Sequence, residues 1–268
     1  MTEAEPRAFN IPASVVWMLA LLVAIHVLRG LLGDETDTQL LVTFAFIPAR
    51  AAGLAGSGWP EGMGHDAWTW LSYAFLHADA THLTVNAIWL VAFASPVARR
   101  FGMARFYLLA VASALAGALA HLLTHWGQVA LLVGASAMVS AYMGAAIRFV
   151  FDGPGGLAGL GAGSGRAAQA PARPVLAALQ NRTTVTFLLV WIAINFLFGL
   201  GALVVPGASG GIAWQAHLGG FAVGFFGFAL FDPPQRPGSP PKGRAPWQDP
   251  EGGARSGNGH DGGHGPLH

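Results

Sequence analysis

Two hydroxyl groups lie in an apolar stretch of this chain, and one of them could act as a nucleophile. The stretch LVGASAMVSAYMG, residues 132–144, contains Ser136 and Ser140, and Gly144 continues their spacing of four. On a helix, this spacing puts small residues on one face, where they let another membrane helix pack closely. A catalytic serine would instead need a base that accepts its proton. This stretch by itself leaves both interpretations open.

Two polar residues that could stabilise an oxyanion occur in the stretch HLTVN. The stretch begins at His82 and ends at Asn86, so on a helix the two side chains lie one turn apart on the same face. Hydrogen-bond donors aimed at one point suit the negative charge that develops during acyl transfer. The pair therefore indicates a candidate oxyanion site.

A candidate base follows in the stretch AHLGGFAVG. His217 is its second residue, and Gly220 and Gly224 repeat at a spacing of four, which lets this helix press against a neighbour. A neutral histidine within hydrogen-bond reach is the usual base for a serine nucleophile. His217 and Ser136 are therefore a candidate catalytic pair.

The composition indicates that membrane helices must hold these residues. Hydrophobic residues make up 53% of the 268 residues, charged residues make up 10%, and the mean hydropathy is +0.50. Such a chain is too apolar for a soluble domain of this size. The net charge of +1 and the scattered arginines argue against a nucleic-acid partner. The absence of cysteine excludes disulfides, thiol catalysis and thiolate metal sites.

Six stretches are long enough to cross a membrane, because a bilayer core about 30 Å thick takes roughly 20 apolar residues per helix. The sequence therefore predicts an all-α polytopic membrane protein, a bundle of six transmembrane helices with a long first outer loop. The predicted spans are 12–31, 71–94, 105–125, 131–151, 183–205 and 212–231.

The arginines of the connecting segments predict the orientation of these spans. One group, Arg99, Arg100 and Arg105, lies between the second and third spans, and a second group lies in the linker 153–182. Because positive residues mark the cytoplasmic side, both segments and both termini are predicted to be cytoplasmic.

The segment after the first span is then predicted to be an acidic outer loop. Its Asp34 and Glu35 are expected to neutralise Arg29, which lies at the outer end of the first span. His77 lies with Asp79 at the outer mouth of the second span, where we expect it to meet water.

The predicted domain organisation is a membrane domain with two polar ends. A cytoplasmic segment, 1–11, precedes the six-helix domain, 12–231, and a cytoplasmic tail, 232–268, follows it. The tail is rich in proline, glycine and charge, which predicts disorder. Its three histidines are better explained as solvated residues than as a metal site.

Under this topology, the candidate residues lie at one depth. His82, Ser136 and His217 each lie within roughly two helical turns of the outward-facing ends of spans two, four and six. This coincidence favours a catalytic role for Ser136 over a packing role alone. Ser140 lies one turn deeper, about 6 Å away, so we expect His217 to serve Ser136 only.

Three motifs, in this order, resemble those of the rhomboid family of intramembrane serine proteases. HLTVN is similar to the family's HxxxN, GASA at 134–137 is similar to GxSG, and AHLGGFAVG is similar to AHxxGxxxG. The resemblance extends from about Trp68 to Phe228, and it places the motifs on the second, fourth and sixth spans of a six-helix core.

The resemblance implies a role for each candidate residue. Ser136 would be the nucleophile and His217 the general base, while His82, Asn86 and the Ser136 backbone N–H would stabilise the oxyanion. The implied activity is intramembrane endopeptidase cleavage of transmembrane segments near their extracytoplasmic ends, without a cofactor or metal. The implied partners are single-span or polytopic membrane protein substrates within the lipid bilayer, and the expected location is the bacterial inner membrane.

Two alanines depart from the family motifs. Ala137 stands where the family has glycine, and Ala141 stands where a second glycine often occurs. If position 137 needed a positive φ, alanine would strain the turn by about 1 kcal/mol or more. If the family's glycine serves only close packing, the one methyl group that alanine adds is tolerable. We favour the packing role.

The alternative function is a non-proteolytic, rhomboid-like scaffold or quality-control protein that binds membrane helices. Such relatives usually lose the serine or the histidine, and this chain keeps both. A transporter is a weaker alternative, because inward-facing carboxylates and a repeat with broken helices are missing from the sequence.

Overall fold

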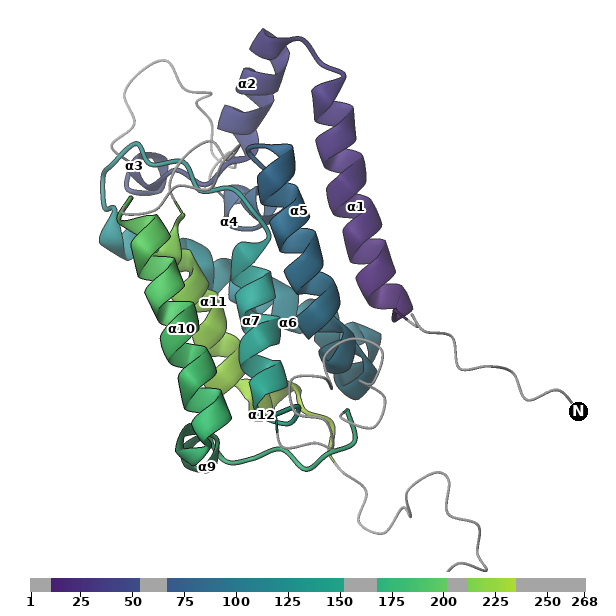
Figure 1. The fold of residues 1–268 in the computed structure, drawn as a ribbon. Coiled ribbons are helices and arrows are strands. Elements are labelled where there is room, and N and C mark those ends of the chain that lie inside the picture. The colour runs from purple at the N-terminus through teal and green to yellow at the C-terminus, as the bar shows by residue number, and fades with distance from the viewer. Residues whose placement is uncertain (1–10, 54–66, 152–167, 202–211, 235–268) are drawn as a thin grey trace, which may run out of the picture. The chain divides into compact units, whose positions relative to one another are not determined.

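The computed structural model describes residues 11–53, 67–151, 168–201 and 212–234, and these ranges are helical apart from turns and connections (Figure 1). The only β feature within them is an isolated bridge between Phe46 and Leu132. The predicted segment 1–11, the tail 232–268 and the linker 153–182 lie wholly or partly outside the described residues.

The helices and helical turns of the described residues follow one another along the chain. In chain order they are α1 (Ala13–Gly30), α2 (Asp34–Phe44), α3 (Pro48–Ala51), α4 (Thr69–Ser72), the 3₁₀ turn η1 (Tyr73–Phe75), α5 (Ala80–Trp89), the π-helical turn η2 (Leu90–Ala94), α6 (Ser95–Thr124), α7 (Ser136–Ile147), α9 (Val175–Gln180), α10 (Arg182–Gly199), α11 (Trp214–Phe226) and α12 (Phe228–Phe231).

Three helical segments among the described residues are long and apolar enough to cross a membrane. They are Ala13–Gly30, Ala80–Thr124 and Arg182–Gly199, and α7 is a shorter apolar helix. The segment Ala80–Thr124 contains residues 80–94 of the predicted second span and all but the last residue of the predicted third span, 105–125. Its helix is interrupted at Gly102, where φ is 73° and ψ is 171°. The all-helical, apolar fold agrees with the predicted class, while the count of six spans stays a prediction.

The helices α6, α7 and α11 form the packed centre of the fold. Every residue of α7 from Ala137 to Ile147 is buried. Glycines let α11 approach both neighbours: a Cβ on Gly224 would overlap the Ala141 carbonyl of α7, and one on Gly219 would lie 2.5 Å from the Ala116 carbonyl oxygen of α6. Close contact between backbones is the packing that small residues permit in membrane helices.

The outer helices α1 and α10 expose apolar side chains. Trp17 of α1 is 67% exposed and Leu189 of α10 is 63% exposed, although both helices are strongly apolar. Exposed apolar faces of this length are those that a bilayer covers. The arrangement therefore fits helices that face lipid.

Two buried arginines tie several elements together on the side of the bundle that carries α12. Arg100 of α6 forms a bidentate ion pair with Asp232, at 2.6 and 2.9 Å, and donates to the Ala170 carbonyl at 2.6 Å. Arg148, which follows α7, donates to the Arg173 carbonyl at 2.7 Å. Arg100 belongs to a segment predicted to be cytoplasmic, and Arg148 lies near the end of the predicted fourth span that leads into the predicted cytoplasmic linker. In the fold the two arginines lie near one another, with both guanidinium groups over the Phe228 ring.

Candidate active site

The predicted fourth span, 131–151, does not begin as a helix. Gly134 has a φ of +120°, which a right-handed helix excludes, and the preceding Leu132 pairs with Phe46 in the isolated bridge. As a result, α7 starts at Ser136 itself. The first residues of a helix have backbone N–H groups without intrahelical partners, so the Ser136 N–H lies where it can serve an anion. Ser136 is half-buried, whereas Ser140 is only 4% exposed.

The second predicted span is also broken, and the break sets the position of His82. The helix α5 begins at Ala80 because Asp79 caps it, with the carboxylate accepting the His82 backbone N–H at 2.7 Å. The imidazole then lies against Gly134. A Cβ on Gly134 would be 2.7 Å from His82 Nε2 and 3.8 Å from Ser136 Oγ. Both the His82 ring and the Ser136 hydroxyl therefore lie within 4 Å of this one point beside Gly134.

Asn86 lies one turn beyond His82 on α5. Its side chain is buried, and its Nδ2 donates to the His82 carbonyl at 3.0 Å. This bond uses one of the two amide hydrogens. The structure therefore links the two predicted oxyanion residues through the backbone of α5, and among the described residues no hydrogen bond joins Asn86 to Ser136.

His217 lies in the first turn of α11, beside the start of α7. A Cβ on Gly220 would overlap the Ala137 carbonyl of α7. A Cβ on Gly117 of α6 would lie 2.6 Å from Ala137 Cβ and 3.2 Å from the Ala216 carbonyl oxygen. Ala137 and Ala216 thus pack against the same point of α6. Ala137 follows Ser136 in the chain, and Ala216 precedes His217, so this packing brings the backbones of the two candidate residues near each other.

The candidate serine and histidine are not hydrogen-bonded to each other in the described part of the chain. His217 Nδ1 instead lies 2.5 Å from Asn195 Oδ1 of α10. Hydrogen bonds between a nucleophile and its base are often long without substrate and tighten in the complex. The geometry is therefore that of two groups on adjacent, closely packed helices rather than a formed pair.

Ala137 adopts its place without a special backbone conformation. It is the second residue of α7 and is fully buried against Gly117 and Gly220. The positive φ in this motif occurs at Gly134 instead. The alanine therefore meets a packing requirement, as the sequence suggested.

His77 does not meet water, so the expectation from the sequence was wrong. Its side chain is fully buried, and its Nε2 accepts the Ala135 backbone N–H at 3.5 Å. Its ring also packs edge-on against the His82 ring, with 5.0 Å between centroids. The loop before α5 folds under the start of α7, and this contact between distant segments has no signal in the local sequence.

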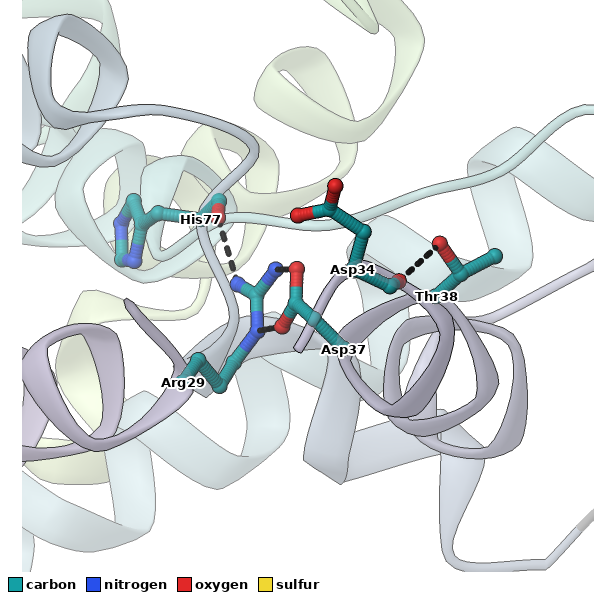
Figure 2. A network of polar contacts seen from close by, with 5 residues as sticks. All are labelled: Arg29, Asp34, Asp37, Thr38 and His77. Carbon is teal, nitrogen blue, oxygen red and sulfur yellow. Dashed lines mark hydrogen bonds and ion pairs between the residues drawn. The ribbon is translucent and has the colours of Figure 1, made fainter. Parts of the chain in front are cut away.

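The carbonyl of His77 accepts a hydrogen bond from Arg29 of α1, which also forms a partly buried ion pair with Asp37 of α2 (Figure 2). Arg29 Nη1 donates to that carbonyl at 2.6 Å, while Nε and Nη2 donate to the Asp37 carboxylate at 2.7 and 3.0 Å. Arg29 is 6% exposed. The expected neutralisation of Arg29 therefore occurs, but its partner is Asp37, because α2 begins at Asp34 and carries Asp37 one turn further along.

Replacing Asp37 with asparagine should destabilise the folded protein. The change leaves the buried Arg29 guanidinium without its anion, although Asp37 itself is 29% exposed, which lowers the cost. We expect the free energy of unfolding to fall by about 1–3 kcal/mol, which a lower Tm in detergent would show. The matched control is Asp34→Asn, which removes a carboxylate from the same helix that does not contact Arg29. Equal Tm values for the two variants would contradict this account of the ion pair.

Asn195 is a polar partner of His217 that the sequence motifs did not reveal. It is 5% exposed and lies within the apolar helix α10. The available signal was a carboxamide in a predicted span, since buried polar groups in membrane helices usually have a partner. Among the described residues, no group of three or more metal-ligating side chains gathers at the site or elsewhere.

Comparison with known proteins agrees with the motifs. The model of the Rhomboid domain family matches residues 64–232. The chain is also 29% identical over 133 residues to the Rhomboid protease GlpG of Serratia proteamaculans (strain 568), a match that covers 47% of this chain and 40% of that protein. The matched part thus spans less than half the length of this curated relative. Because the family match covers more than half of the chain, this protein belongs to the rhomboid family.

Proposed function

We propose that this protein is an intramembrane serine endopeptidase that cuts transmembrane segments of membrane proteins near their extracytoplasmic ends. Ser136 is the nucleophile and His217 is the general base. The observation that carries the proposal is that the His82 ring and the Ser136 hydroxyl both lie within 4 Å of one point beside Gly134, at the N-terminus of a buried helix. The packing of α11 on α7 and the family membership support it further.

The proposed reaction is acyl transfer through a covalent intermediate. Ser136 Oγ attacks the carbonyl carbon of the scissile peptide bond while His217 Nε2 takes the hydroxyl proton. The carbonyl oxygen becomes an oxyanion, which receives hydrogen bonds from His82, Asn86 and the Ser136 backbone N–H. His217 then gives its proton to the leaving amide nitrogen, and the C–N bond breaks. A water molecule, activated in the same way, hydrolyses the acyl-enzyme and restores Ser136.

The oxyanion residues should affect turnover more than substrate binding, because the charge they stabilise appears only during the reaction. We expect His82→Ala to lower kcat on the order of 10²-fold to 10³-fold with little change in KM. Asn86→Ala should lower kcat less, because one of its amide hydrogens is bound to the His82 carbonyl. Steady-state cleavage of a fluorogenic transmembrane peptide measures both values. A variant that kept full turnover would have a packing role only.

The proposal includes six spans with an extracytoplasmic first loop and cytoplasmic ends. It places the segment 1–11, the linker 153–182 and the tail 232–268 in the cytoplasm, and the membrane would be the bacterial inner membrane. The distribution of loop arginines supports this orientation. The active site would then open toward the outside.

Reporter fusions can test this topology. A fusion made after Arg173 is expected to report the cytoplasm, and one made within 33–66 is expected to report the outside. The opposite result at Arg173 would overturn the topology and the argument that the candidate residues share one depth.

Purified protein and a panel of single-span substrates provide the direct test of function. Cleavage by the purified chain, together with labelling of Ser136 by a serine-directed fluorophosphonate, is the expected result. No cofactor or metal should be needed, so cleavage should persist in a chelator. Binding of substrates without cleavage or labelling would instead support the alternative function, a non-proteolytic scaffold.

A further inference from the structure

The imidazole of His217 has a polar partner on a third helix. Asn195 Oδ1 of α10 lies 2.5 Å from His217 Nδ1, 22 residues away in the sequence. Asn195 is 5% exposed, and its Nδ2 donates to the Trp191 carbonyl at 2.8 Å. Both ends of the carboxamide are therefore engaged, one by its own helix and the other by the candidate base.

The bond to Trp191 determines which end of the carboxamide faces His217. A backbone carbonyl only accepts hydrogen bonds, so the amide nitrogen of Asn195 must point toward Trp191. The oxygen is then the atom that faces the imidazole. Because this oxygen only accepts, the hydrogen of the contact must reside on His217 Nδ1.

We propose that Asn195 is a positioning residue that holds His217 with Nδ1 protonated, so that Nε2 keeps its lone pair for the Ser136 proton. The site is then a Ser–His–Asn arrangement rather than a serine–histidine pair. This inference rests on the proposed function, and it names the group that orients the base.

The same contact serves both states of the base. Neutral His217 donates from Nδ1 to Asn195 Oδ1, and the imidazolium that forms when Nε2 takes the serine proton keeps that donor in place. Neither the His217 imidazole nor the Asn195 carboxamide has to rotate during the proton transfer. Without the contact, the neutral ring could carry its proton on Nε2, and that tautomer cannot accept a proton from serine.

An apolar residue at position 195 would satisfy packing equally well. Asn195 lies in a helix whose neighbouring residues are apolar, and burying a carboxamide there is unfavourable unless it is hydrogen-bonded. The two bonds to Trp191 and His217 offset that cost. A purely structural role would need only the first of them.

Kinetics of three variants test the proposal. Asn195→Leu keeps the volume but removes the acceptor, so we expect kcat to fall about 10-fold to 100-fold with KM little changed. Asn195→Asp keeps an acceptor oxygen toward Nδ1 and should retain kcat within about threefold of the wild type. The matched control is Asn181→Ala, which removes the side-chain cap of α10 at its Thr184 N–H without touching His217. It should weaken α10 but leave kcat unchanged.

The tautomer of His217 provides a readout that does not depend on cleavage. In ¹⁵N-histidine-labelled wild-type protein, with the signal assigned by its loss in His217→Gln, we expect a protonated Nδ1 and an unprotonated Nε2. In Asn195→Leu, the Nε2-protonated form should appear. Finding the Nε2-protonated form in the wild type, or wild-type kcat in Asn195→Leu, would overturn the proposal. Absence of cleavage and of Ser136 labelling in the wild type would overturn the proposed function instead, and the NMR result would still decide the role of Asn195.

Discussion

Replacing Ser136 with alanine is expected to lower the rate of substrate cleavage on the order of 10⁴-fold to 10⁶-fold, because the chain loses its nucleophile. The fold should persist. Ser136 is the first residue of α7 and is half-buried, and alanine is a strong helix former. Purified variant and wild type should therefore show similar Tm values in detergent, while only the wild type cleaves the substrate and reacts with a fluorophosphonate.

The matched control for this experiment is Ser140→Ala. Ser140 lies on the same helix, one turn or about 6 Å further along, and it is buried at 4% exposure. A base within reach of one hydroxyl cannot reach the other, since hydrogen-bond reach is about 3 Å. Ser140→Ala should keep most of the activity with a modest loss of stability. Fluorophosphonate labelling of Ser140, or cleavage by purified Ser136→Ala, would show that the nucleophile has been misassigned.

Replacing Gly220 with alanine is expected to lower both stability and activity, although the change adds a single methyl group. The new Cβ would overlap the Ala137 carbonyl, which belongs to the backbone of α7 and cannot move as a flexible side chain does. The two helices would have to separate, at a cost of about 1–3 kcal/mol or more. Because His217 lies one turn before Gly220, the separation would also carry the base away from Ser136. A displacement of about 1 Å can lower a rate by about 10²-fold.

Gly30→Ala is the matched control for this second prediction. Gly30 is also helical, at the end of α1, and no atom lies within 4 Å of its added Cβ. The free energy of unfolding of Gly30→Ala should differ from that of the wild type by no more than about 0.5 kcal/mol. Thermal unfolding in detergent and substrate cleavage measure both variants. If Gly220→Ala behaved like Gly30→Ala, α7 and α11 would not be in the close backbone contact described above.

The sequence by itself identified the candidate residues and the helical, membrane-spanning class of the fold. His82, Ser136 and His217 stand out because polar groups within apolar stretches are costly and therefore informative. The helix α1 occupies Ala13–Gly30, close to the predicted 12–31, because a long apolar run has few alternatives to a helix in a membrane. The glycine spacing of AHLGGFAVG likewise predicted the close packing of its helix on a neighbour.

Only the tertiary structure decided how these residues meet. The helix α7 starts at Ser136 because Gly134 takes a positive φ beside the His82 ring, and glycine permits that conformation without requiring it. The burial of His77 depends on its loop folding against α7, and its carbonyl accepts a hydrogen bond from Arg29 of α1. These contacts join segments far apart in the chain, and local spacing carries no record of which partner lies across a helix–helix interface.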